Sequence, residues 1–164
     1  MAKKDKDFLS GLNVPWITKD GYLDLTKYPI DSILKQSLSK EERSFRSACN
    51  LLASMYSAGR TEAAVLLYGL FILNQNDMAR KELIIEAIKH INTPEAASLL
   101  FTELNQIESS NSTRVYIDTI LKSLSYFPVD LVEDGFESLL NDARWSYKMK
   151  RKFREILDGI KYRY

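Results

Sequence analysis

The single histidine, His90, is the first candidate for chemistry, because an imidazole can transfer protons or ligate a metal near neutral pH. It follows Glu86 by four positions in a segment with helical spacing, so both side chains project from one helix face. Such a pair could hold a metal ion, but the sequence has no second histidine and no cysteine nearby to complete the site. We therefore interpret His90 as a surface residue whose charge suits the negative end of its helix.

A set of four carboxylates is the second candidate. They follow the helical spacing i, i+3, i+4 and i+7, and are Asp130, Glu133, Asp134 and Glu137. Residues at this spacing share one helix face, and carboxylate oxygens suit a divalent cation. No complementary helix with further ligands is evident, so we interpret the set as a solvated acidic face.

Motifs that carry catalytic mechanisms are missing from the sequence. It has no glycine-rich phosphate loop, no nucleophile elbow and no metal-binding spacing. With one His and one Cys, most acid–base and nucleophilic arrangements would need carboxylates alone. We therefore predict a protein that is not an enzyme and has no cofactor or metal. Cys49 cannot form an internal disulfide, and its apolar neighbours predict burial.

The charge is balanced overall but uneven locally. The 164 residues include 23 Lys and Arg against 22 Asp and Glu, which gives no global reason to expect nucleic acid or an acidic membrane as partner. Range 127–142 holds five acids and no base, whereas range 143–164 holds eight bases and two acids. We expect the two segments to run antiparallel and to pair Asp130, Glu133 and Glu137 with Lys148, Lys152 and Arg154.

The elements that must position these residues are helices. Thr93 followed by Pro94 is the clearest helix start, and Ser39 with Glu42 predicts a capping box. Helices are predicted over about 30–38, 39–57, 61–74, 77–91, from 93 to the polar turn at 109–112, 113–126, 128–140 and 144–160. No convincing strand interrupts them, so the predicted class is all-α. Range 1–29 is rich in turn residues and predicts an extended arm before a single helical-repeat domain over 30–164.

The helices also repeat. Three apolar sets share the spacing i, i+3, i+4, i+7 at shifts of 33 and 36 residues: Ile84, Ala87, Ile88 and Ile91; Ile117, Ile120, Leu121 and Leu124; Phe153, Ile156, Leu157 and Ile160. A basic residue precedes each set by three positions: Lys81, Arg114 and Lys150. Any amphipathic bundle yields such sets. The joint recurrence of helix lengths, short turns and the basic position favours a repeat of about 35 residues.

This pattern resembles the HEAT-like repeats of α-solenoids over about residues 39–160. The resemblance implies a right-handed α-α superhelix of about three to four helical hairpins, preceded by the N-terminal arm. The first helix is short, and range 129–142 lacks the Glu-Ala-Ala start seen near residues 62 and 95. Both departures are terminal, where capping repeats are expected to be atypical.

A helical repeat without a catalytic signature predicts a non-enzymatic protein–protein interaction module, such as an adaptor, an assembly factor or an inhibitor of a specific partner. If the helices beginning near residues 77, 113 and 144 line the inner face, as the resemblance implies, their solvent-facing bases contact the partner. These are Arg80, Lys81, Arg114, Lys122, Lys148, Arg151 and Lys152.

Nucleic-acid binding through the basic C-terminal helix is the alternative function. Bases interleaved with aromatics can contact phosphates and stack on nucleobases. However, Trp145 and Phe153 fall on one apolar helical stripe and are more simply core residues. The longest uncharged apolar run, 63–73, is too short to cross a bilayer, so we expect no membrane insertion and a cytoplasmic location.

Overall fold

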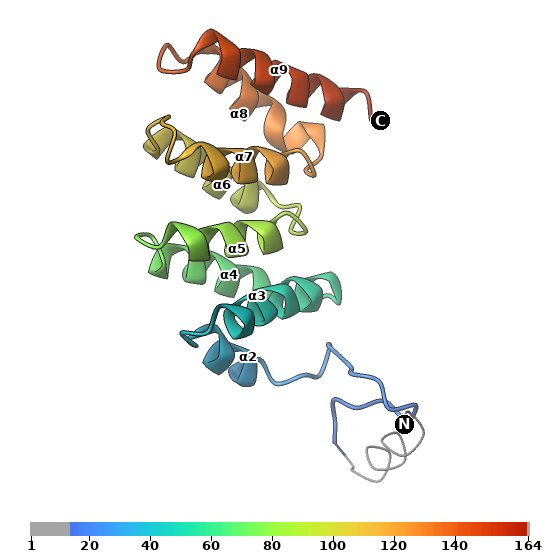
Figure 1. Cartoon of the computed structure of the whole chain (residues 1–164). Helices are drawn as coiled ribbons and strands as arrows, with labels where there is room; N and C mark the ends of the chain where they lie inside the picture. Colours follow the sequence, from blue (N-terminus) through green and yellow to red (C-terminus); the bar gives the residue numbers. More distant parts are fainter. Residues whose placement is uncertain (1–13, 164) are drawn as a thin grey trace, which may run out of the picture. The chain divides into compact units, whose positions relative to one another are not determined.

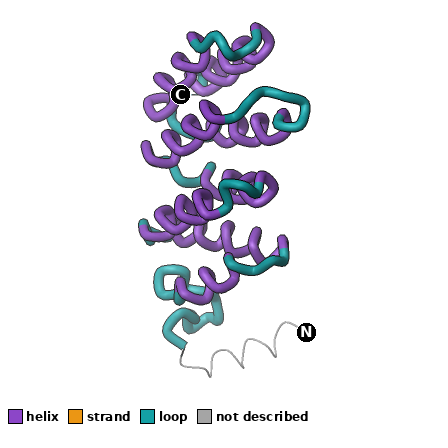
Figure 2. The backbone as a smooth tube through the Cα atoms, turned by 90° about the vertical axis from the view of Figure 1, so that its left-hand side faces the viewer, coloured by secondary structure: helices purple, strands orange, loops and turns teal. Residues whose placement is uncertain are grey.

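The computed structural model describes residues 14–163, and in that range the chain is all-helical (Figure 1). The helices are α2 (Ile30–Ser37), α3 (Glu42–Ser57), α4 (Glu62–Leu73), α5 (Met78–Ile88), α6 (Pro94–Gln106), α7 (Arg114–Leu124), α8 (Val129–Asn141) and α9 (Tyr147–Lys161). The described residues form helices and loops without a strand (Figure 2). Their only extended pairing is an isolated bridge between Ile17 and Leu23. The predicted all-α class is confirmed.

Of the two predicted cap positions, Thr93 is confirmed, and Asp77 caps a further helix. The Thr93 hydroxyl accepts from the N–H of Ala96, and the Asp77 carboxylate accepts from the N–H of Arg80. The predicted capping box at Ser39 is wrong. Its hydroxyl accepts from the N–H of Glu41, and Glu41 is itself the N-cap, so α3 begins two residues later than a Ser39 cap would place it.

The chain divides into two compact units, Met1–Val65 and Leu66–Tyr164, which are described separately. In the first unit α2 packs against α3, and the core includes Ile33, Phe45 and Cys49, each almost fully buried. The predicted burial of Cys49 is confirmed. Residues 1–13 of the predicted arm lie outside the described residues, and the predicted domain boundary at residue 29 stays a prediction.

The described part of the arm is joined to the helices of its unit by an aromatic contact and a hydrogen bond. Trp16 meets Tyr28 edge to face, with 6.3 Å between the ring centroids. The guanidinium of Arg60, just before α4, donates to the Tyr28 carbonyl. These contacts order a segment whose glycines and prolines prevent a helix.

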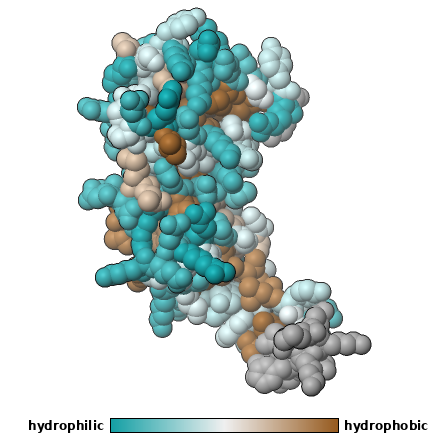
Figure 3. All heavy atoms as spheres, viewed as in Figure 1, coloured by the Kyte–Doolittle hydropathy of each residue, from teal (hydrophilic) through white to brown (hydrophobic). Residues whose placement is uncertain are grey.

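In the second unit each helix packs on its neighbours. Helix α5 contacts α7, α6 contacts both α7 and α8, and α8 contacts α9. The three repeated apolar sets supply the core, since all their members are buried except the half-buried Ile156. Hydrophilic residues cover most of the visible surface of this unit, and hydrophobic residues show in the gaps between them (Figure 3).

Gly135 allows a close approach between α6 and α8. A Cβ atom added at this position would lie 2.4 Å from a ring carbon of Phe101 on α6, which is closer than real Cβ atoms pack. The same ring meets Phe136 edge to face at 5.4 Å between centroids. The missing side chain of Gly135 therefore makes room for an aromatic pair that holds the two helices together.

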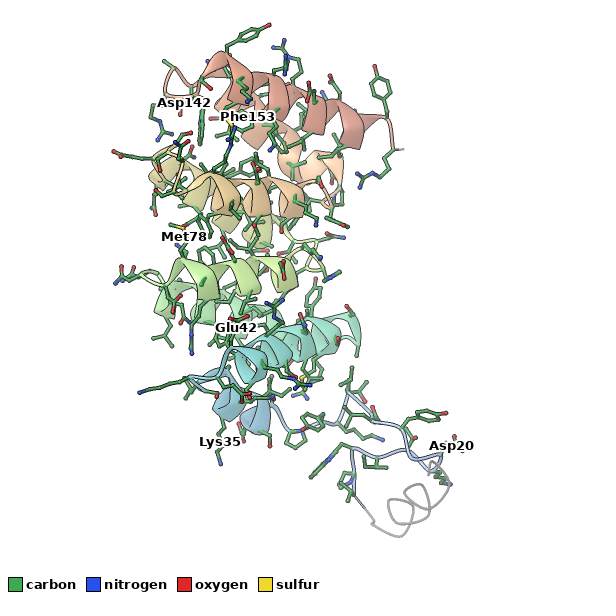
Figure 4. The ribbon with its side chains drawn as sticks, in the orientation of Figure 1. Asp20, Lys35, Glu42, Met78, Asp142 and Phe153 are labelled. Atoms are coloured by element: carbon green, nitrogen blue, oxygen red, sulfur yellow. The ribbon has the colours of Figure 1, made fainter. Side chains whose placement is uncertain are left out.

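The turns inside the hairpins of the second unit all lie at one edge. In Figure 1 the α4–α5, α6–α7 and α8–α9 turns are at the left, and the turns that join one hairpin to the next are at the right. Met78 and Asp142, labelled in Figure 4, mark this edge at two of the turns. The cavities described below are lined by residues of these turns.

Candidate functional site

Four of the seven basic residues predicted to bind a partner line one cavity. The cavity has a volume of about 390 Å³ and lies between α7, α9 and the α6–α7 turn. The four are Arg114, Lys148, Arg151 and Lys152. Two carboxylates (Asp118 and Glu155), polar residues 109–111 and Ser146, and the apolar Ile117 and Met149 complete its lining. We call this cavity the basic groove.

Local structure places the four bases on two separate elements. Arg114 is the first residue of α7, and the turn before it is held by Thr113, whose hydroxyl donates to the Glu108 carbonyl and accepts from the N–H of Ser110. Helix α9 begins after Ser146, whose hydroxyl accepts from the N–H of Met149. The other three bases then follow at i, i+3 and i+4, which puts them on one face of α9.

The basic groove keeps a surplus of positive charge. Lys152 Nζ lies 2.6 Å from Asp118 Oδ1, and Arg151 Nε lies 3.4 Å from Glu155 Oε1. The side chains of Arg114 and Lys148 are exposed and form no hydrogen bond or ion pair with any residue in range 14–163. Four cations against two carboxylates therefore leave two positive charges without a partner among the described residues.

The predicted pairing of the acidic and basic segments is wrong in register. Glu133 of α8 forms an ion pair with Lys161, near the far end of α9, and Lys152 pairs with Asp118 of α7 instead of with α8. The nearby Glu133 carboxylate raises the pKa of Lys161 above its ordinary value. Because α8 and α9 run antiparallel, the acids near the start of α8 meet the end of α9, and the first half of α9 is left to line the groove.

The other three predicted residues lie outside the basic groove. Lys122 is exposed near the end of α7, and Arg80 is half-buried, with its Nε 3.7 Å from Asp77 Oδ2. Lys81 does not face solvent as predicted, because it is 7% exposed and pairs with Glu103 of α6. Helical spacing in the sequence could have shown this, since Lys81 stands at i, i+3, i+4 and i+7 with Ile84, Ile85 and Ile88.

Lys81, Glu103 and Tyr116 form a buried polar cluster, which lines a second cavity of about 470 Å³. Lys81 Nζ donates to Glu103 Oε1, and Tyr116 Oη donates to the same oxygen at 2.8 Å. Burial and the neighbouring Glu103 carboxylate raise the pKa of Tyr116 far above its ordinary value, so the hydroxyl keeps its proton. Sequence analysis missed Glu103 and Tyr116.

The remaining candidates lie at the surface. His90 is exposed, as interpreted from the sequence, but it lies in the turn after α5 and not within the helix. Asp130, Asp134 and Glu137 are exposed on α8. Within the described part of the chain, no three or more His, Cys, Asp or Glu residues are grouped so that they could hold a metal ion.

Comparisons give this chain no relatives. No protein-family model, no curated protein and no solved structure matches it. None of the helices in range 14–163 combines the length and the apolar character needed to span a membrane.

Proposed function

We propose that this chain is a non-enzymatic protein–protein interaction module whose hairpins are HEAT-like repeats wound into a right-handed superhelix. Two features of the second unit support the repeat. The equivalent apolar positions of α5, α7 and α9 are almost all buried, and α6 packs against both α7 and α8. Stacked repeats bury their cores in this way and leave the turns and one helix layer for binding.

The basic groove is the proposed binding site, and its occupant is an acidic segment of a partner protein. One observation carries the proposal: bases from two separate helices line one cavity, and two of them lack a partner among the described residues. Arg114 offers a planar guanidinium that suits a carboxylate. Exposed charges of this kind set orientation and association rate more than raw affinity.

Charge reversal within and outside the groove tests this function. A fluorescein-labelled peptide of twelve glutamates is titrated with the protein, and binding is followed by fluorescence anisotropy at low salt. The double variant Arg114→Glu/Lys148→Glu should weaken binding at least about tenfold, because each change replaces an attraction by a repulsion. The same peptide with serine in place of glutamate should not bind.

A matched control separates the groove from net charge. The variant Lys122→Glu/Arg154→Glu changes the net charge by the same amount on the same two helices, at exposed residues that do not line the groove. It should weaken binding less than about twofold. Equal losses in the two variants, or no binding by the parent protein, would count against the groove as the site.

Nucleic acid is the second candidate occupant, since Tyr147 is 84% exposed next to Lys148 and could stack on a base. Two aromatics of this region, Trp145 and Phe153, are less suitable. Trp145 and Phe153 are buried against each other, edge to face at 5.2 Å between ring centroids. A twenty-nucleotide single strand that binds more tightly than the glutamate peptide, with a steep loss of affinity on adding salt, would favour this alternative.

A further inference from the structure

The second cavity, between the α4–α5 and α6–α7 hairpins, has an apolar wall and a charged floor. Phe71, Met78, Leu99 and Ile107 supply apolar surface, and the Lys81–Glu103–Tyr116 cluster forms the floor. Only 9% of the Lys81 side chain and 12% of the Glu103 side chain remain exposed. A cavity of this volume with a few convergent polar groups has the usual features of a small-ligand site.

Hydrogen bonding within the cluster is incomplete on both charged groups. Glu103 Oε1 accepts from Lys81 and from Tyr116, but Oε2 accepts from no residue in range 14–163. The Lys81 ammonium has three donors and uses one of them on Glu103. Its nitrogen also lies over the rings of Phe71, at 4.7 Å, and Tyr116, at 5.6 Å from the centroid. A spare acceptor and a spare donor therefore lie side by side on the cavity floor.

The opposite charges of Lys81 and Glu103 determine which kind of ligand group can complete the hydrogen bonding of the cluster. Adding an anion would place a second negative charge beside Glu103, and adding a cation would place a second positive charge beside Lys81. Either would also be desolvated in a largely buried site. A neutral group with one donor and one acceptor satisfies both sides without adding charge.

We propose that this cavity binds a neutral carboxamide carried on an apolar body. The amide N–H donates to Glu103 Oε2, the amide carbonyl accepts from Lys81 Nζ, and the apolar body lies against Phe71 and Leu99. The site does not depend on the basic groove, because the two cavities share no lining residue. The carboxamide is therefore a ligand in addition to the acidic segment proposed for the basic groove.

Three matched fragments test the proposed ligand class. Benzamide, benzoate and benzylamine carry one ring with a neutral, an anionic and a cationic head, and each is titrated into the ¹⁵N-labelled protein at pH 7. Benzamide should shift amide signals of residues around the cavity saturably, with a Kd on the order of millimolar. Benzoate and benzylamine should bind at least about tenfold more weakly. Equal binding of all three, or no saturable shift with benzamide, would overturn the proposal.

A blocking variant keeps the cluster intact and locates the binding site. Thr102 is exposed at the cavity lining, so Thr102→Trp should fill the cavity and abolish benzamide binding. Ser98→Trp, one turn earlier on α6 and outside the cavity lining, should leave the benzamide Kd within about twofold. Both variants should keep the far-ultraviolet circular dichroism of the parent. Unchanged binding in a folded Thr102→Trp protein would exclude this cavity.

The same titration distinguishes two sources of the amide. Butanamide presents the carboxamide on an aliphatic chain as a partner's glutamine side chain would, and butanoate is its charged control. Binding of butanamide alone supports a glutamine side chain as the ligand. Binding of benzamide alone supports a free aromatic amide, and binding of butanoate as tightly as butanamide contradicts the proposal.

Discussion

The two cavities near the α6–α7 turn each contain a lysine–carboxylate ion pair, and the two pairs differ in exposure. One holds the ion pair Lys81–Glu103, whose side chains are 9% and 12% exposed, and the other holds Lys152–Asp118, at 40% and 47%. In the buried pair Lys81 and Tyr116 share one oxygen of Glu103, and the other oxygen and the remaining Lys81 donors stay open to the cavity. In the exposed groove the charges are partly hydrated, and neighbouring bases remain without a partner among the described residues. Burial, more than residue type, therefore distinguishes the proposed site for a neutral ligand from the proposed site for an acidic segment.

Breaking the buried pair should have the largest effect. Lys81→Met leaves Glu103 as an uncompensated charge inside the unit, so we expect a loss of about 3–5 kcal/mol in the free energy of unfolding. Urea unfolding followed by circular dichroism measures it. The double variant Lys81→Met/Glu103→Met removes both charges and should recover most of the loss. A single variant as stable as the parent would contradict the assigned burial.

Truncating buried isoleucines gives a reference loss of stability that involves no charged group. Ile88 and Ile120 are both fully buried, so Ile88→Ala and Ile120→Ala should each lower the free energy of unfolding by about 2–5 kcal/mol. The same urea experiment applies. A loss under about 0.5 kcal/mol at both positions would mean that the repeated apolar sets do not form the core.

Breaking the exposed pair should have a small effect. Lys152→Met removes the partner of Asp118, but both groups are hydrated, so the expected change is about 0–1 kcal/mol. Raising the salt concentration should reduce even this difference, because exposed charges are screened. A loss of unfolding free energy as large as that in Lys81→Met would contradict the proposed difference between the exposed and the buried pair.

The ion pair between Arg144 and Asp142 extends the comparison to the pH dependence of stability. The side chain of Arg144 hydrogen-bonds Asp142 and holds the pKa of that carboxyl below its ordinary value. Its contribution to stability is therefore present above the unfolded-state pKa and is lost as the pH falls through the lower folded-state pKa. Carbon-detected NMR titration should show the Asp142 pKa rising towards its ordinary value in Arg144→Gln. An unchanged pKa would mean that Arg144 is not its cause.

Helix positions were predictable because local signals encode them. Thr93 and Asp77 cap their helices with side chains a few residues from the groups they bind, so sequence spacing is enough. The three apolar sets were predictable for the same reason. The error at Ser39 arose because a Ser and a Glu three positions apart also fit a turn that precedes a helix starting two residues later.

Contacts between helices were less predictable. Glu103 lies 22 residues after Lys81 and 13 before Tyr116, and no local pattern joins the three. The short α8–α9 turn implies antiparallel helices but does not set their register, which is why Glu133 meets Lys161 and not a base of the groove. Arg114 was selected for its charge alone, and only the packing of α7 beside α9 places it with Lys148.

The ion pair between α7 and α9 also links the groove to local opening of the chain. Helix α9 packs mainly on α8, and its segment is linked to the α7 region by Lys152 with Asp118 and by Arg163, just after the helix, with the Ser125 carbonyl. Exposed contacts of this kind allow α9 to separate from α7 at less free energy than global unfolding requires. Each such opening dismantles the groove, so an occupant that bridges α7 and α9 would slow hydrogen exchange at the amides of α9.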